Sequence, residues 1–201
     1  WGRGDNPRII RSLIEAQLAA KDEGALPLLL ALFERVEGEG RIDFERDILH
    51  YGRRAEGRML QLLHADSRSL VMRAMDALAK MGSVAAGDSI ARLLQHPEPW
   101  LRISAAHAVG EIGAEGAAAH LVAALDDTTY SVVNAALVGL GRLKAMETYE
   151  RVAALAASAN KHVRKHAAIA LGELGDRRGL EIVARMASDD SDSGVRFMAG
   201  R

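Results

Sequence analysis

The sequence contains no cysteine, only four prolines and only eight aromatic residues among its 201 positions. The absence of cysteine excludes disulfides, thiolate metal sites and cysteine nucleophiles, and it favours a reducing, cytoplasmic compartment. The scarcity of aromatic and β-branched residues argues against an all-β fold. The longest apolar run, around residues 25–33, is too short to span a bilayer, so we expect no membrane association.

Charge of one sign is also lacking, because 26 Lys and Arg nearly balance 27 Asp and Glu and both signs are spread along the chain. This distribution argues against a dedicated nucleic-acid binder. The apolar content of 49% argues against a disordered tail. The chain lacks an initiator methionine and stops in mid-pattern, so we interpret it as a piece of a larger protein, in which missing targeting signals carry little weight.

Alanine is abundant, with 36 copies, and many of them recur at a fixed period. Four segments align without a gap, at residues 77–82, 108–113, 139–144 and 170–175, and their last residues, the anchors, are 31 apart. Apolar or small residues stand at constant offsets before and after each anchor. Further anchors fall at Tyr51 and, with a spacing one residue shorter, at Lys21. The pattern predicts one solenoid domain over 1–201, with degenerate repeats at 8–64, regular repeats at 65–192 and a truncated repeat at 193–201.

Each repeat has the pattern of two short helices. Apolar residues before the anchor follow helical spacing, and a glycine at the anchor favours a helix end with positive φ. A second apolar stripe follows the anchor, and a polar or proline-containing segment then separates the repeats. Small residues three before the anchor (Ala79, Gly110, Gly141, Gly172) are expected to let neighbouring first helices pack closely. A helix pair this short buries little apolar surface alone, so we expect about six pairs that stack into one core.

The sequences at 101–113 and 163–175 follow the motif V-R-x-x-A-A-x-A-L-G-x-I-G and resemble HEAT repeats, in particular the short variety named for phycobilisome lyases. The resemblance is close over residues 65–201 and loose over 8–64. It implies an all-α fold, a right-handed α-solenoid whose second helices line the concave face. It implies no single activity, because members include interaction scaffolds, chromophore-lyase subunits and an iron hydroxylase.

The sequence excludes the iron hydroxylase activity. The hydroxylases of the HEAT family carry repeated His-Glu pairs just before the A-A-x-A-L-G run, and the matching positions here hold Lys165-His166 and other pairs that cannot form a dinuclear metal site. No catalytic motif is present, and we predict no catalytic residue, metal or cofactor. His162 and His166 have the spacing of a metal pair, but neighbouring cations favour two surface histidines. His107 is interpreted as a partly buried histidine. The acidic pairs 126–127 and 189–190 are interpreted as turn and capping residues.

The surface of the second helices is therefore the candidate site. Residues between the core positions of these helices should form a stripe on the concave face that binds an acidic segment of a protein partner, and an ordinary solvated face is the alternative. The predicted stripe consists of Arg58, Gln61, Ser89, Arg92, His120, Glu150, Arg151 and Arg185.

The primary functional prediction is a non-catalytic interaction or scaffold module. Its protein partner could be another part of the same parent chain, and the sequence leaves the oligomeric state open. The alternative is a subunit of a phycobilin-lyase-like enzyme that attaches a chromophore or modifies a protein. The absence of cysteine and the scarcity of aromatics to hold a planar pigment argue against it. DNA binding is a third option, which the near-neutral charge disfavours.

Overall fold

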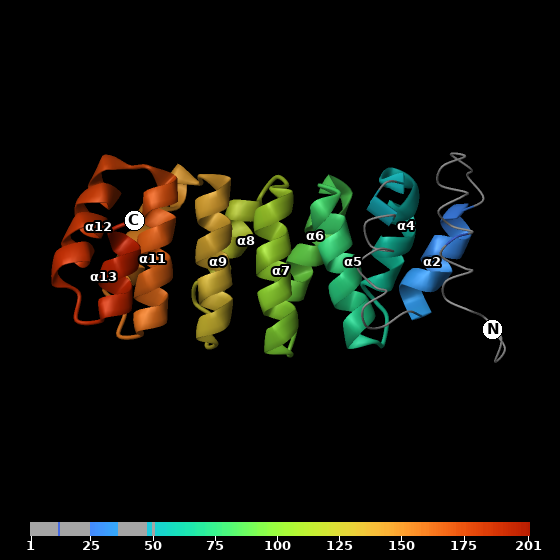
Figure 1. Ribbon diagram of the computed structural model, residues 1–201, viewed down its shortest axis with the longest axis horizontal. Coiled ribbons are helices and arrows are strands. Elements are labelled where there is room, and N and C mark those ends of the chain that lie inside the picture. Colours follow the sequence, from blue (N-terminus) through green and yellow to red (C-terminus); the bar gives the residue numbers. More distant parts are fainter. Residues whose placement is uncertain (1–11, 13–24, 36–47, 50) are drawn as a thin grey trace. The chain divides into compact units, whose positions relative to one another are not determined.

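The computed structural model describes residue 12 and residues 25–35, 48–49 and 51–201 of the chain (Figure 1). Internal packing divides the chain into two compact units, residues 1–77 and 78–201, and each is described by itself. The anchor predicted at Lys21 lies outside the described residues, as does much of the predicted degenerate region. The organisation of residues 1–201 as one solenoid domain stays a prediction.

The first unit contains helices α2 (Ala25–Arg35) and α4 (Arg53–Leu62) and most of α5 (Arg68–Lys80). Its described core contains apolar side chains with no exposed surface, namely Leu29, Phe33, Ile48, Ala55, Met59 and Ala74. The buried guanidinium of Arg73 on α5 stacks 4.1 Å from the centre of the Phe33 ring on α2. This cation–π contact lets a charge lie inside the unit beside an aromatic face.

The second unit is a succession of helix pairs, and every regular element among the described residues is helical. The first helices of the pairs are α7 (Pro99–Ile112), α9 (Tyr130–Leu143), α11 (Lys161–Leu174) and the short α13 (Ser193–Ala199). The second helices are α6 (Gly87–Arg92), α8 (Ala117–Ala124), α10 (Tyr149–Leu155) and α12 (Arg177–Asp189). Short 3-10 turns at Val84–Ala86, Leu93–Gln95 and Met146–Thr148 flank α6 and precede α10.

The anchor positions of the four segments that align without a gap end the first helices in the left-handed conformation, as the sequence predicts, whereas at Tyr51 the positive φ falls one residue later, on Gly52. Gly82, Gly113 and Gly175 have φ values of 62°, 62° and 72°. Lys144 occupies the same position with φ 50°, and it is the only non-glycine with positive φ in the described residues. The N–H groups of Lys144 and Ala145 bond to carbonyls in the last turn of α9, at 2.9 and 3.3 Å, so the turn is closed as a helix C-cap.

The first helices α7, α9 and α11 stand side by side (Figure 1), and glycine sets how closely two of them approach. A Cβ atom at Gly110 of α7 would overlap the backbone of Gly139 on α9. A Cβ at Gly141 would meet the flexible side chain of Glu173 on α11. The packing reason predicted for the small residues therefore holds at these two positions. It does not hold at Gly172, where nothing lies within 4 Å.

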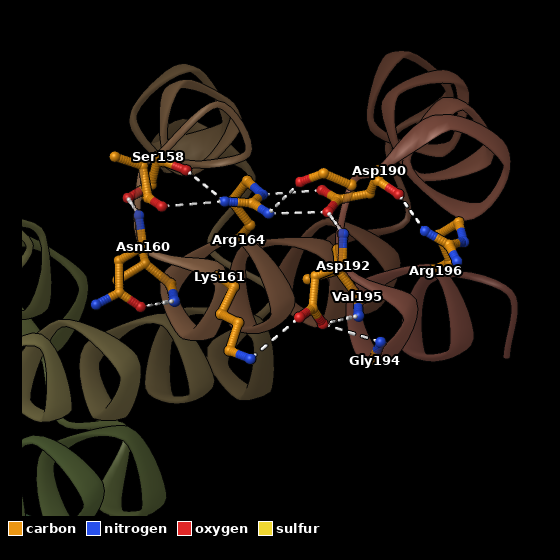
Figure 2. Close-up of polar contacts among 12 residues, drawn as sticks. Ser158, Asn160, Lys161, Arg164, Asp190, Asp192, Gly194, Val195 and Arg196 are labelled. Carbon is orange, nitrogen blue, oxygen red and sulfur yellow. Dashed lines mark hydrogen bonds and ion pairs between the residues drawn. The ribbon is translucent and has the colours of Figure 1, made fainter.

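Arginine side chains join successive inter-repeat loops in the second unit (Figure 2). Arg164 donates one edge of its guanidinium to both carboxylate oxygens of Asp190, at 2.8 Å each, and its remaining nitrogen to the carbonyls of Ser158 and Ala159. Two repeats earlier in the sequence, Arg102 makes the same bonds. It donates to Asp127 at 2.6 and 3.0 Å and to two carbonyls of the preceding loop. We call this arrangement the arginine clamp. Bidentate, charge-assisted bonds of this kind fix orientation as well as distance.

The second members of the acidic pairs 126–127 and 189–190 serve the turns, as predicted, because Asp127 and Asp190 accept from the backbone N–H groups two residues later and are also the clamp acceptors. The first members make no such turn bond, and Asp126 pairs with Arg151 instead.

The Arg164 guanidinium holds the pKa of Asp190 below its ordinary value, although burial opposes this. Burial raises the pKa of Asp127, but hydrogen bonds from Arg102 and from the Thr129 N–H outweigh it, and the net shift is also downward. Both carboxylates are therefore stabilised in the charged form by the folded chain.

Replacing Lys144 with glycine should stabilise the protein. The left-handed conformation costs an ordinary residue about 1–2 kcal/mol, whereas glycine adopts it freely but loses more chain entropy on folding. We expect Lys144→Gly to raise the free energy of unfolding in urea by about 0.5–1 kcal/mol. Gly175→Ala is the matched control, because its Cβ would meet nothing within 4 Å and only the backbone conformation is penalised. It should lower stability, and a gain in both variants would contradict the assignment.

The arginine clamp predicts a loss of stability in acid. A carboxylate whose pKa is lowered on folding contributes stability that is present above its unfolded pKa, about 3.9, and is lost as the pH falls through the lower folded value. The free energy of unfolding should therefore decline below about pH 4, and Asp190→Asn should reduce that decline. Asp189→Asn, which changes an exposed neighbour, is the control and should leave the slope unchanged. Equal pH slopes in Asp190→Asn and the unchanged chain would refute a role for the clamp.

Candidate protein-binding face

An open groove of about 320 Å³ lies between the second helices α6 and α8. Its apolar lining comes from Ala91, Leu94 and Ala123, and its polar lining comes from Asp88, Arg92, Gln95 and His120. We call it the α6–α8 groove. Arg92 and His120, two residues of the predicted stripe, are thus brought to one hollow although they are 28 positions apart in the sequence.

The helical repeat explains this juxtaposition. His120 stands seven residues after the anchor Gly113, and Arg92 stands ten residues after the anchor Gly82. Positions seven and ten lie one turn apart on the same helical face, so neighbouring second helices present them together. Both side chains are exposed, and Arg92 has no carboxylate partner in the described part of the chain.

Three other residues of the predicted stripe are held by contacts within their own unit. Arg58, in the first unit, forms two bonds with Glu34 at 2.7 and 2.9 Å and donates to Gln61 at 2.9 Å. The side-chain bond and charge of Glu34 raise the pKa of Arg58. Arg151 of α10 pairs with Asp126 at 2.8 Å. These arginines are exposed but already have a carboxylate or amide partner, which reduces what they can offer to a ligand.

Glu150 contributes negative charge to the surface beside Arg151. It accepts from Arg178 of α12 at 3.0 Å, and Arg178 also bonds to Asp176 and lies 4.0 Å from the centre of the Tyr149 ring. Of the remaining stripe residues, Ser89 is half-buried on α6 and Arg185 is exposed on α12. The surface of the second helices is therefore mixed in charge. Two arginines of the predicted stripe in the second unit, Arg92 and Arg185, have no carboxylate partner among the described residues.

Sequence reasoning missed the other polar residues of the groove, Asp88 and Gln95. Asp88 stands six residues after its anchor, the position that Glu150 occupies two repeats later, so the repeat pattern contained a signal for it. Gln95 lies in the turn after α6, beyond the helical pattern of the stripe. The acidic partners of the arginines were missed because they come from neighbouring repeats, 24 to 28 residues away.

Among the described residues, no group of three or more His, Cys, Asp or Glu side chains that could hold a metal ion is found. The His166 ring nitrogen lies 2.7 Å from the backbone oxygen of His162, so that ring is engaged by its own helix. His107 is more exposed on α7 than predicted, although partial desolvation and the charge of Arg142 lower its pKa. Among the described residues, no helix is both long and apolar enough to cross a membrane.

A family model for HEAT repeats matches residues 56–140 and 134–201, well over half of the sequence. The chain belongs to the HEAT repeat family. This membership and the helix pairs of the described residues confirm the predicted fold class, an all-α solenoid of HEAT-like pairs. No curated protein matches this HEAT repeat chain.

Solved structures of similar fold include natural and designed solenoids. The complex of CpcE and CpcF of phycocyanin lyase from Nostoc sp. PCC7120 matches with a TM-score of 0.64 and 21% identity, over 73% of this chain and 98% of that one. The archaeal HEAT-like repeats protein from Thermococcus onnurineus NA1 matches with a TM-score of 0.58 and 13% identity, over 99% and 96%. A designed armadillo repeat protein in complex with the peptide (KR)4 matches with a TM-score of 0.59 and 16% identity, over 96% of both chains. At these identities the likeness shows the fold alone.

Proposed function

We propose that this HEAT repeat chain is a non-catalytic interaction module that binds an acidic segment of a protein partner on its second helices, with the α6–α8 groove as the centre of the site. The observation that carries the proposal is that Arg92 is exposed at the α6–α8 groove and has no carboxylate partner among the described residues. Carboxylate partners are present for Arg58, Arg151 and Arg178.

The lining of the groove supports an extended peptide as the ligand. The apolar side chains of Ala91, Leu94 and Ala123 lie beside the exposed guanidinium, so a peptide that covers them would displace water there and strengthen the attraction between Arg92 and a carboxylate. Gln95 carries both a donor and an acceptor, as a ligand with a free peptide backbone requires. Asp88 at the same groove disfavours a run of carboxylates without a basic or neutral residue between them, so we expect a ligand with spaced acidic residues.

The proposal predicts that charge reversal at Arg92 weakens the binding of acidic peptides. Fluorescence anisotropy would compare a labelled peptide of alternating glutamate and serine with the basic peptide (KR)4. We expect the acidic peptide to bind the unchanged chain more tightly, and Arg92→Glu to weaken that binding by about tenfold or more, because one attraction becomes a repulsion.

Arg142→Glu is the matched control, because Arg142 is an exposed arginine on the first helix α9. Circular dichroism should show the same helicity in all three proteins. An equal loss of binding in both variants would show that the peptide responds to net charge alone. No preference for the acidic peptide would refute the groove as its site.

The alternative function, a subunit of a phycobilin-lyase-like enzyme, is favoured by one observation, the likeness to the phycocyanin lyase complex. Incubation of the chain with a bilin and its acceptor protein discriminates the two functions. Covalent adduct formation that depends on the chain would support the alternative, whereas an interaction module produces none.

A further inference from the structure

Two ion pairs between successive second helices use the same two positions of the repeat. Arg58 stands seven residues after its anchor and bonds to Glu34, which stands 13 residues after the anchor before it. Arg151 and Asp126 have the same two offsets and pair at 2.8 Å. In both cases an arginine reaches an acidic residue at the end of the preceding second helix. We call these two offsets the bridge positions.

The bridge positions at the α6–α8 groove hold Gln95 and His120. Gln95 stands 13 residues after the anchor Gly82, and His120 stands seven residues after the next anchor. Both side chains line the groove, and neither makes a hydrogen bond or ion pair with another described residue. A neutral amide and an imidazole thus stand where a carboxylate and a guanidinium pair elsewhere, and the bridge is missing.

The next two junctions of the 78–201 unit do have ion pairs between their repeats. Arg151 of α10 bonds to Asp126 after α8, and Arg178 of α12 bonds to Glu150 of α10 at 3.0 Å. Among the described residues no such pair joins α6 to α8, where Arg92 also has no carboxylate partner. The groove therefore brings together several donors for a carboxylate and leaves the place of that carboxylate open.

We propose that a single carboxylate of the ligand occupies this place, where it accepts from Arg92, Gln95 and His120 and completes the missing bridge. The inference rests on the proposed binding of an acidic segment and names its central contact. The Arg92 guanidinium supplies a permanent positive charge, and the Gln95 amide supplies a neutral donor. The His120 imidazole supplies a charge-assisted bond when it is protonated, so it makes the affinity depend on pH.

The elements that pack against α8 place three charged residues near His120 in the described part of the chain. Asp88 and Arg92 of α6 line the groove with it. Glu115, in the turn before α8, lies with it at a small cavity beside the groove. The part of α7 at that cavity is apolar, and α9 contacts α8 at the buried Leu121. These charges are present with and without a ligand, so a change of affinity with pH reports the carboxylate that the ligand adds.

The sign of the pH effect follows from the chemistry of the two partners. An imidazole gains its proton between about pH 8 and pH 5, whereas most glutamates stay charged above about pH 5. A bound carboxylate stabilises the protonated imidazole, so the free energy of binding becomes more favourable as the pH falls through this range. The chain therefore binds acidic segments more tightly at pH 5.5 than at pH 7.5.

Fluorescence anisotropy at these two pH values tests the role of His120, with the labelled peptide of alternating glutamate and serine. We expect the unchanged chain to bind about fivefold more tightly at pH 5.5, because one exposed charge-assisted bond is gained. His120→Gln should reduce this ratio to about one. His162→Gln is the matched control, because His162 is an exposed histidine on the first helix α11, and it should keep the ratio.

Rebuilding the bridge tests the place of the carboxylate. The double variant with Gln95→Asp and His120→Arg contains the residue types that pair between α8 and α10, and at pH 7.5 it keeps the net charge. We expect it to bind the peptide about tenfold or more weakly although Arg92 remains, because its own aspartate repels and replaces the ligand's carboxylate. His120→Arg alone should bind about threefold or more tightly at pH 7.5 and lose the pH dependence. Circular dichroism should show the same helicity in all variants.

The outcomes separate this inference from the proposed function. A double variant that binds as tightly as the unchanged chain would overturn the inference, and so would a pH ratio that His120→Gln leaves unaltered. If Arg92→Glu still weakens binding in that case, the proposed function stands without it. No binding of the acidic peptide by the unchanged chain would refute the proposed function and this inference together.

Discussion

The close contact between α7 and α9 is the constraint on which the second unit depends. Gly110 and Gly139 face each other so closely that a Cβ atom at Gly110 would overlap the Gly139 backbone, and glycine therefore allows these first helices to approach. Close packing of this kind increases the dispersion contacts between the two helices. Because each second helix is tied to its own first helix by a tight left-handed turn, this spacing also sets how far apart α8 and α10 lie.

The arginine clamps hold the same stack at its loops. Each clamp orders the loop before a first helix and the loop after the following second helix, so it sets the register between one repeat and the next. Val133 occupies the arginine position in the repeat between the two clamps, so that repeat makes no clamp, and its core residues Val132 and Ala136 have no exposed surface. The resulting framework leaves the outer surface of the second helices free to carry function.

The repeat pattern allowed much of the fold to be predicted, because a fixed period of 31 constrains every repeat at once. The left-handed position of Lys144 followed from glycines in the same column, although lysine alone gives no such signal. The contact at Gly139 could not be predicted, because Gly139 lies outside the small-residue column and its role depends on how two helices meet. Gly172 shows the converse case, because the column predicts a close contact there and none of the described residues makes it.

The candidate site was predictable only in part. Position within the repeat brought Arg92 and His120 to the same face, and the groove contains both. The helical position of an arginine does not by itself distinguish a free edge from a paired one, since Arg92 and Arg151 have equally good helical positions. Pairing depends on acidic residues such as Glu34 and Asp126, which stand 13 residues after the anchors of the preceding repeats, a signal that only the comparison of adjacent repeats contains.

The most direct test of the close-packed stack compares alanine at two glycines of the same column. Gly110→Ala should lower the free energy of unfolding in urea by about 2 kcal/mol or more, because its methyl group would overlap the Gly139 backbone. Gly172→Ala, in the same helical position but with open space around it, should raise that free energy by about 0.5–1 kcal/mol through helix propensity. The account predicts these opposite signs. Stabilisation by alanine at both positions would contradict it.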